Sequence, residues 1–204
     1  MIPYNLIHPK TGEKTKINLP SAEDITLNQF IESGGISSPE SLAKLSGTEA
    51  DLWNNVAFDD VIGILAKYPL WDELLPPKEI EYNGTQHKVP DNIERLPWGA
   101  HIMARNLFSK LGENPIINVY PDIIAIFMCQ EINGTFSDVA ASDIAESIGE
   151  IPAIQGYPLA SFFLKRWIEL QKNGMKSLKT QTATDQTGTE QSSESKGTAP
   201  EKQG

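Results

Sequence analysis

The sequence predicts an α+β protein with two β-hairpins, each followed by short helices, a mainly helical second half and a disordered C-terminal tail. Three observations predict it. The pair Asn83-Gly84 separates two alternating segments, as in a two-residue hairpin turn. Apolar residues recur at helical spacing through much of the second half. Beyond Asn173 the only large apolar side chains are Met175 and Leu178, too few to offset the conformational entropy of ordering that segment.

The first hairpin is expected from residues 2–8 and 14–19, which flank a turn that contains glycine. Thr15, Ile17 and Leu19 alternate with polar residues, which is the period of a half-buried strand.

Start and stop signals predict helices after this hairpin. Thr26 and Gln29 have the spacing of a capping box, and Gly34-Gly35 ends the helix that they begin. The second helix begins at Ser38-Pro39-Glu40, and the third begins within residues 48–51.

After the start signal at residues 48–51, a helix is expected to run to about residue 67. Phe58, Ile62 and Leu65 stand at i, i+4 and i+7, which predicts that they share one apolar face.

The second hairpin joins residues 78–82 to residues 85–89 through Asn83-Gly84. The later helices are expected at about residues 97–111, 121–132, 137–148 and 158–172. The segment 121–132 is apolar on most faces, so we expect it to be buried.

The sequence after one hairpin resembles the sequence after the other. Leu19-Pro20 and Val89-Pro90 each close a strand, and an acidic spacer and a helix start follow both. Chance and an internal repeat both explain this similarity. We divide the chain into residues 1–77, residues 78–173 and the tail 174–204, with the first two parts either separate or built around one shared core.

The charge is strongly acidic, with 17 Lys+Arg against 27 Asp+Glu and a net charge of −10 over 204 residues. Lysines and acids cancel within residues 174–204, so the whole excess belongs to residues 1–173. This excess argues against nucleic acid or an anionic membrane as the partner. No apolar run is long enough for a membrane span, and the N-terminal residues lack the apolar core of a secretion signal.

Residues with catalytic chemistry do not form a recognisable constellation. Cys129 lies on the helix that we expect to be buried, where a thiol behaves as a small hydrophobe. His8, His87 and His101 are dispersed and lack the spacing of a zinc or di-iron site. We therefore expect no metal and no cofactor.

Acidic pairs are read as solvated charges. Asp59 and Asp60 diverge by about 100° on a helix, so their carboxylates do not face one another. Glu131 and Asp138 lie close in sequence, in a chain with many acids. No glycine-rich phosphate loop is present, so no catalytic residue is assigned and we expect a protein that is not an enzyme.

One helix carries an aromatic stripe. Its residues share one side of the segment 158–172 and are the candidate partner-binding residues Leu159, Phe162, Phe163, Trp167 and Leu170. The stripe is either part of the core or an interface for another protein.

Within residues 17–31 and 79–103 the elements follow the order strand, Asn-Gly, strand, Val-Pro, acidic spacer and helix start. In this order the chain resembles small tailed-bacteriophage proteins. These are tail-assembly chaperones and virion-morphogenesis proteins, acidic, mixed α/β at the start and helical afterwards. The resemblance implies phage structural proteins as partners and a place in the host cytoplasm or the virion.

The expected function is therefore a non-enzymatic protein–protein interaction, in a phage assembly chaperone or a minor virion component. Two alternatives stay open: a small enzyme with a carboxylate-based site, and an adaptor domain of a cellular complex.

Overall fold

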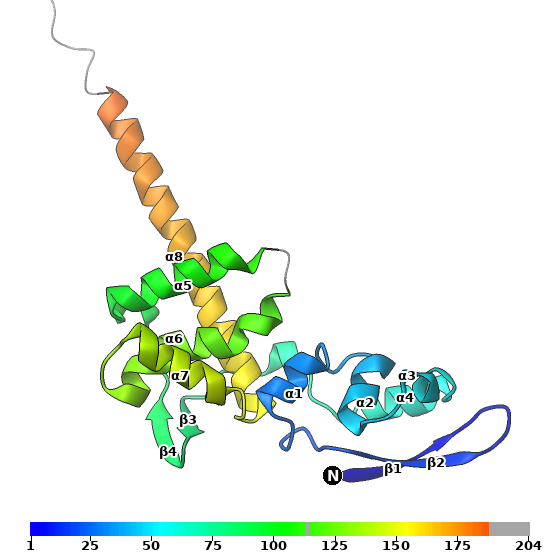
Figure 1. The fold of residues 1–204 in the computed structure, drawn as a ribbon. Helices are drawn as coiled ribbons and strands as arrows, with labels where there is room; N and C mark the ends of the chain where they lie inside the picture. Colours follow the sequence, from blue (N-terminus) through cyan, green and yellow to red (C-terminus); the bar gives the residue numbers. More distant parts are fainter. Residues whose placement is uncertain (113–114, 188–204) are drawn as a thin grey trace, which may run out of the picture. The chain divides into compact units, whose positions relative to one another are not determined.

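The computed structural model describes residues 1–112 and 115–187 and confirms the α+β class (Figure 1). It divides into two compact units, residues 1–166 and residues 167–204, and each is considered by itself. In chain order the strands, helices and 3-10 helices (η) are β1 (Ile2–Ile7), β2 (Lys14–Leu19), α1 (Leu27–Glu32), α2 (Pro39–Ser46), α3 (Ala50–Asn54), α4 (Phe58–Leu65), η1 (Trp71–Glu73), β3 (Glu79–Tyr82), β4 (Thr85–Lys88), η2 (Ile93–Arg95), α5 (Trp98–Leu111), η3 (Ile116–Val119), α6 (Tyr120–Asn133), α7 (Asp138–Ile148) and α8 (Ala153–Thr187).

Both predicted hairpins are present as two-stranded antiparallel sheets. In the first, Ile2 of β1 lies opposite Leu19 of β2. In the second, Tyr82 lies opposite Thr85, and the turn residues Asn83 and Gly84 have φ angles of 51° and 72°. Two consecutive positive φ angles are what a type I′ turn requires, so the sequence signal is confirmed.

The first hairpin packs its inner face on the helices that follow it. Leu6, Ile17 and Leu19 are buried in one cluster with Phe30 of α1 and Trp53 of α3. Figure 1 shows α1 to α4 gathered beside the β1–β2 hairpin. Alternation along the strands therefore gives the sheet one apolar face, and the helices cover it.

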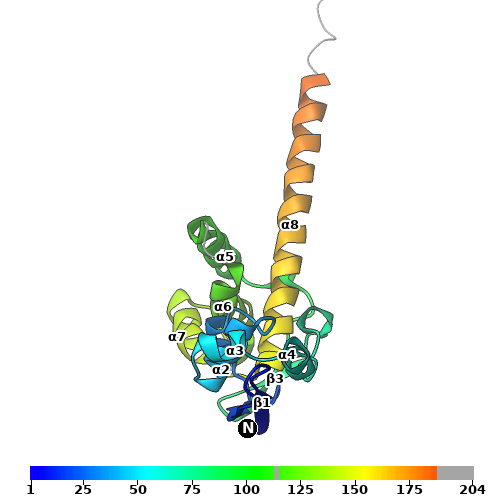
Figure 2. The ribbon, with the colours of Figure 1, turned by 90° about the vertical axis from the view of Figure 1, so that its right-hand side faces the viewer.

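The second half is built around α6, which is buried from Ile123 to Cys129, as its apolar sequence predicts. The ring of Phe127 lies 5.2 Å from the ring of Phe163 on α8, centroid to centroid. Figure 2 shows α6 and α7 on the same side of the first turns of α8.

Backbone hydrogen bonds connect the beginning of this unit to its end. The amide of Ala153 donates to the carbonyl of Ile25 at 2.7 Å, and the amide of Leu27 donates to the carbonyl of Ile151 at 2.9 Å. Ala153 also belongs to the buried cluster of the first hairpin. The parts 1–77 and 78–173 therefore share buried contacts.

Two of the predicted helix starts are confirmed. Thr26 and Gln29 form a complete capping box at α1, and Ser38 caps α2 with Pro39 at its first position. The third start differs from the expectation, because α3 is preceded by Glu49 with no side-chain cap. The hydroxyl of Thr48 instead accepts a hydrogen bond from the indole of Trp53 at 2.8 Å.

The apolar face predicted for α4 is wrong. Phe58 is 75% exposed and Ile62 is 45% exposed, whereas Val61 and Ile64 are buried. The helix contains apolar residues on two sides, and spacing alone does not tell which side meets the core. Phe58 and Ile62 consequently form an exposed apolar pair.

The last helix is longer than predicted at both ends. It begins at Ala153, so Pro158 lies within it, and it continues to Thr187. A helix that is already nucleated extends at little cost through residues without proline. The predicted tail therefore begins as helix, and residues 188–204 lie outside the described residues.

The two hairpin-and-helix segments differ at corresponding positions. Leu27 at the start of α1 is fully buried, whereas Trp98 at the start of α5 is 76% exposed. The similar sequences therefore pack differently.

Candidate protein-binding groove

The predicted aromatic stripe is mainly buried. Leu159 and Phe163 are fully buried, and Trp167 is 5% exposed. Phe162 and Leu170 are partly buried. Since Phe163 packs on Phe127 of α6, the part of α8 that carries Leu159 and Phe163 belongs to the core of residues 1–166.

Phe162 takes part in a different feature, a surface groove of about 410 Å³ within residues 1–166. Three segments line this groove: η1 with the residues after it, the first residue of α6, and the early turns of α8. Its aromatic side chains are Trp71, Tyr120, Tyr157 and Phe162. Segments far apart in the sequence thus bring four rings to one place.

The rings support one another through edge contacts. Trp71 lies 4.5 Å from Phe30 and 6.2 Å from Tyr157, centroid to centroid, and Tyr120 lies 5.7 Å from Tyr157. Tilted and edge-on arrangements at these distances are favourable for aromatic pairs. The indole Nε1 of Trp71 is buried and finds no acceptor among the described residues. The rings are therefore held by packing, which gives the groove a firm apolar floor.

A hydrogen bond fixes η1 against α8. The hydroxyl of Tyr157 donates to the carboxylate of Asp72. Burial raises the pKa of Tyr157, and the hydrogen bond to Asp72 raises it further. The hydroxyl is thus protonated at neutral pH and remains a donor.

The lip of the groove combines an exposed apolar residue with charges. Leu75 lines the groove and is 86% exposed. Asp72 and Glu73 are exposed on the η1 side, and Lys165 is exposed on the α8 side. Neither carboxylate forms an ion pair with any residue that the structure describes.

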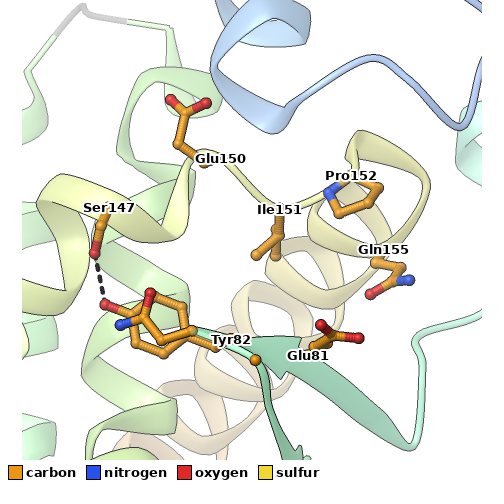
Figure 3. A pocket seen from close by; sticks show the side chains of 9 residues that line it. Glu81, Tyr82, Ser147, Glu150, Ile151, Pro152 and Gln155 are labelled. Carbon is orange, nitrogen blue, oxygen red and sulfur yellow. Dashed lines mark hydrogen bonds between the residues drawn. The ribbon is translucent and has the colours of Figure 1, made fainter.

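A second pocket, of about 360 Å³, is lined by polar and apolar residues together (Figure 3). It lies where the β3–β4 turn meets the loop between α7 and α8. The hydroxyls of Tyr82 and Ser147 are 2.5 Å apart, and the Nδ2 of Asn28 donates to Glu150 at 2.9 Å. Figure 3 shows Glu81 and Glu150 on different sides of the opening. Tyr82 and Ser147 already bond to each other, and Glu150 bonds to Asn28 outside the pocket, so the residues that line this pocket present no evident catalytic pair.

The sequence-predicted histidines are spread over the fold. His8 is in the first hairpin turn, where its Nδ1 accepts hydrogen bonds from the amides of Lys10 and Thr11. His87 contacts the carbonyl of Glu131 at 3.1 Å, and His101 is on α5 near Trp98. Within the described ranges, no three His, Cys, Asp or Glu side chains could hold a metal ion together.

Cys129 is fully buried, and its sulfur lies 3.8 Å from the carbonyl oxygens of Thr135 and Ser137. The thiol therefore fills space beside the turn after α6. Asp59 and Asp60 line a shallow pocket with Tyr4 and Leu6, and Glu131 and Asp138 are exposed.

Sequence reasoning missed Trp71, Tyr120, Tyr157 and Leu75 as site residues. The segment from Pro69 to Pro77 carries a signal, because it places Trp71 and three leucines between prolines. Which rings would meet it depends on the tertiary fold.

Comparison of the chain with protein-family models, with curated proteins and with solved structures gives no match. Among the described helices, none combines the length and the apolar character that a membrane span requires.

Proposed function

We propose that this chain is a non-enzymatic protein-binding protein whose docking surface is the groove between η1 and α8. The observation that carries the proposal is the concentration of Trp71, Tyr120, Tyr157 and Phe162 beside an exposed leucine at position 75. Aromatic side chains dominate the energetics of protein interfaces, and a leucine exposed at 86% stabilises little in the isolated chain.

The resemblance to tailed-bacteriophage assembly proteins supports a more specific proposal about the role and the partner of the chain. In this proposal the chain acts as an assembly chaperone or a minor virion component, and its partner is a phage structural protein. The acidic charge of residues 1–173 and the mixed α/β beginning agree with that class.

Two leucines that flank η1 provide a matched test. Leu75 lines the groove, whereas Leu70 is 68% exposed and does not line it. The products of neighbouring genes are purified one by one and titrated against the wild type, Leu75→Gln and Leu70→Gln. Because both leucines are exposed, both variants should keep the wild-type circular dichroism and melting temperature.

We expect one product to bind the wild type and Leu70→Gln alike, and to bind Leu75→Gln at least about tenfold more weakly, as for an interface anchor. Equal binding by both variants would contradict the groove as the docking surface. Absence of binding to every product, together with turnover of a generic phosphate or glycoside substrate, would contradict the non-enzymatic function.

A further inference from the structure

The charged residues at the edge of the groove restrict the chemistry of its partner more than the aromatic rings do. Asp72 and Glu73 are adjacent, exposed and without an ion-pair partner among the described residues. They lie at the edge of an apolar floor that includes Trp71 and Phe162. We propose that the groove binds a short basic segment of a partner protein, in which an aromatic or branched aliphatic side chain is next to a lysine or arginine. This inference rests on the proposed function and narrows its partner.

The size of the groove suits one anchoring side chain with its neighbours. A volume of about 410 Å³ lies at the lower end of the range for sites that enclose small molecules. A bulky apolar side chain can therefore cover Phe162 and Leu75 without displacing the packed ring of Trp71. Its burial supplies the affinity, because the apolar area leaves water on both partners.

Charge complementarity then selects the residue beside the anchor. Residues 1–173 carry the whole net charge of −10, so a basic segment is attracted at long range and an acidic one is repelled. At short range Glu73 offers a free carboxylate, and Asp72 retains a second oxygen beyond the one that accepts from Tyr157. A lysine or arginine of the partner can bind both residues.

Lys165 sets the direction of the bound segment. It is exposed on the α8 side of the groove and forms no ion pair with Asp72 or Glu73 within the described residues. A cation of the partner is therefore favoured on the η1 side and disfavoured on the α8 side. The groove thus binds the basic residue in one orientation relative to the anchor.

The chain's own C-terminal residues do not fit this description. Beyond residue 187 they include lysines at positions 196 and 202 but no aromatic, leucine, isoleucine, valine or methionine residue. They lack the anchor that the apolar floor requires, so the occupant comes from another protein.

The test uses the full chain and a displayed library of random peptides of about 12 residues. Peptides that bind the wild type are counter-selected against Leu75→Gln, so that only groove-dependent binders remain. Their affinities are then measured by fluorescence anisotropy for the wild type, Glu73→Lys and Glu146→Lys. Glu146 is exposed on α7 and does not line the groove, so its substitution makes the same change in net charge elsewhere.

We expect the surviving peptides to pair a bulky apolar residue with lysine or arginine. Glu73→Lys should weaken them about fivefold or more, and Glu146→Lys by less than about twofold, since distant surface charges are screened. Replacing the peptide's basic residue by glutamate should restore binding to Glu73→Lys. Circular dichroism of each variant separates lost binding from lost fold.

Groove-dependent peptides that are neutral or acidic would overturn the basic partner while leaving protein binding in place. Equal weakening by Glu73→Lys and Glu146→Lys would also overturn it, since the attraction would then be non-specific. Self-association that disappears in Leu75→Gln, seen by analytical ultracentrifugation, would assign the groove to a second copy of this chain and overturn the inference. Absence of any groove-dependent peptide would overturn it as well, and the titrations with neighbouring gene products would then decide the proposed function independently.

Discussion

The hydroxyl of Tyr157 donates a hydrogen bond to the carboxylate of Asp72, 85 residues earlier in the chain. This contact joins η1, a short turn between prolines, to the second turn of α8. The same two residues line the groove, so its width depends on their bond.

The bond between these two side chains should be measurable by a double-mutant cycle of Tyr157→Phe and Asp72→Ala. We expect a coupling free energy of about 1 kcal/mol, typical of an exposed hydrogen bond that involves a charged group. Urea unfolding of the four proteins gives this value. Additive effects of the two substitutions would show that the bond contributes nothing to stability.

Tyr68 should make the fold sensitive to alkaline pH. Its hydroxyl donates to the carbonyl of Pro20 at 3.0 Å, and burial raises its pKa to about 12 from an ordinary 10.0. Its contribution to stability is complete below pH 10 and is lost as the pH rises toward 12, because the unfolded chain ionises first. Melting temperatures across this range should fall more steeply for the wild type than for Tyr68→Phe. Parallel curves would disprove the role of this tyrosine.

Gly84→Val should destabilise the protein by roughly 1 kcal/mol or more, because a β-branched residue resists positive φ. A Cβ atom at Gly84 would meet no neighbour within 4 Å, so the loss would be purely conformational. Gly63→Ala is the control, since its Cβ also meets nothing and an alanine favours the helix. Thermal unfolding of both variants should show a loss only at position 84.

Gly149→Ala should be destabilising for a steric reason. The new Cβ atom would overlap the Oδ1 of Asn28, whose Nδ2 donates to Glu150. Rotating the Asn28 side chain away would break that bond, at a cost of about 1 kcal/mol. The double variant Gly149→Ala, Asn28→Ala should therefore be more stable than the sum of the single changes allows.

Removing residues 174–204 should leave the melting temperature within about 2 °C, since this segment supplies only two large apolar side chains. Differential scanning calorimetry of the full and shortened chains provides the measurement. A loss of about ten degrees would mean that Met175 or Leu178 is buried against another part of the protein.

Local rules predicted the hairpins and most of the helix ends, because these depend on neighbours in sequence. The Asn83-Gly84 turn and the Thr26–Gln29 capping box are each determined by residues that are close in sequence. The face of α4 was mispredicted, since Phe58 and Val61 are equally apolar and only the position of the first hairpin decides which is covered. Long-range packing has no local signature.

The groove could not be predicted for the same reason. Trp71 and Tyr157 are far apart in the chain, and the sequence around either residue does not indicate that the two rings meet. The periodicity of α8 correctly placed Leu159 and Phe163 on the same side of the helix. It left open whether that side is buried in the core. Phe162, at the edge of the stripe, is the member that reaches the groove.

The backbone hydrogen bonds that join Ile25 and Leu27 to residues 151–153 determine how early the N-terminal half can complete its fold during synthesis. About 125 residues separate the two segments, and at about 5–20 residues per second the ribosome needs roughly 6–25 s to translate them. Throughout that interval Ile25 and Leu27, whose side chains are fully buried in the finished fold, lack the segment 151–153 to which their backbone groups bond. The N-terminal half therefore completes its fold only after residues 151–153 have left the ribosome, and a nascent chain stalled before Ala153 leaves the apolar side chains of Ile25 and Leu27 uncovered.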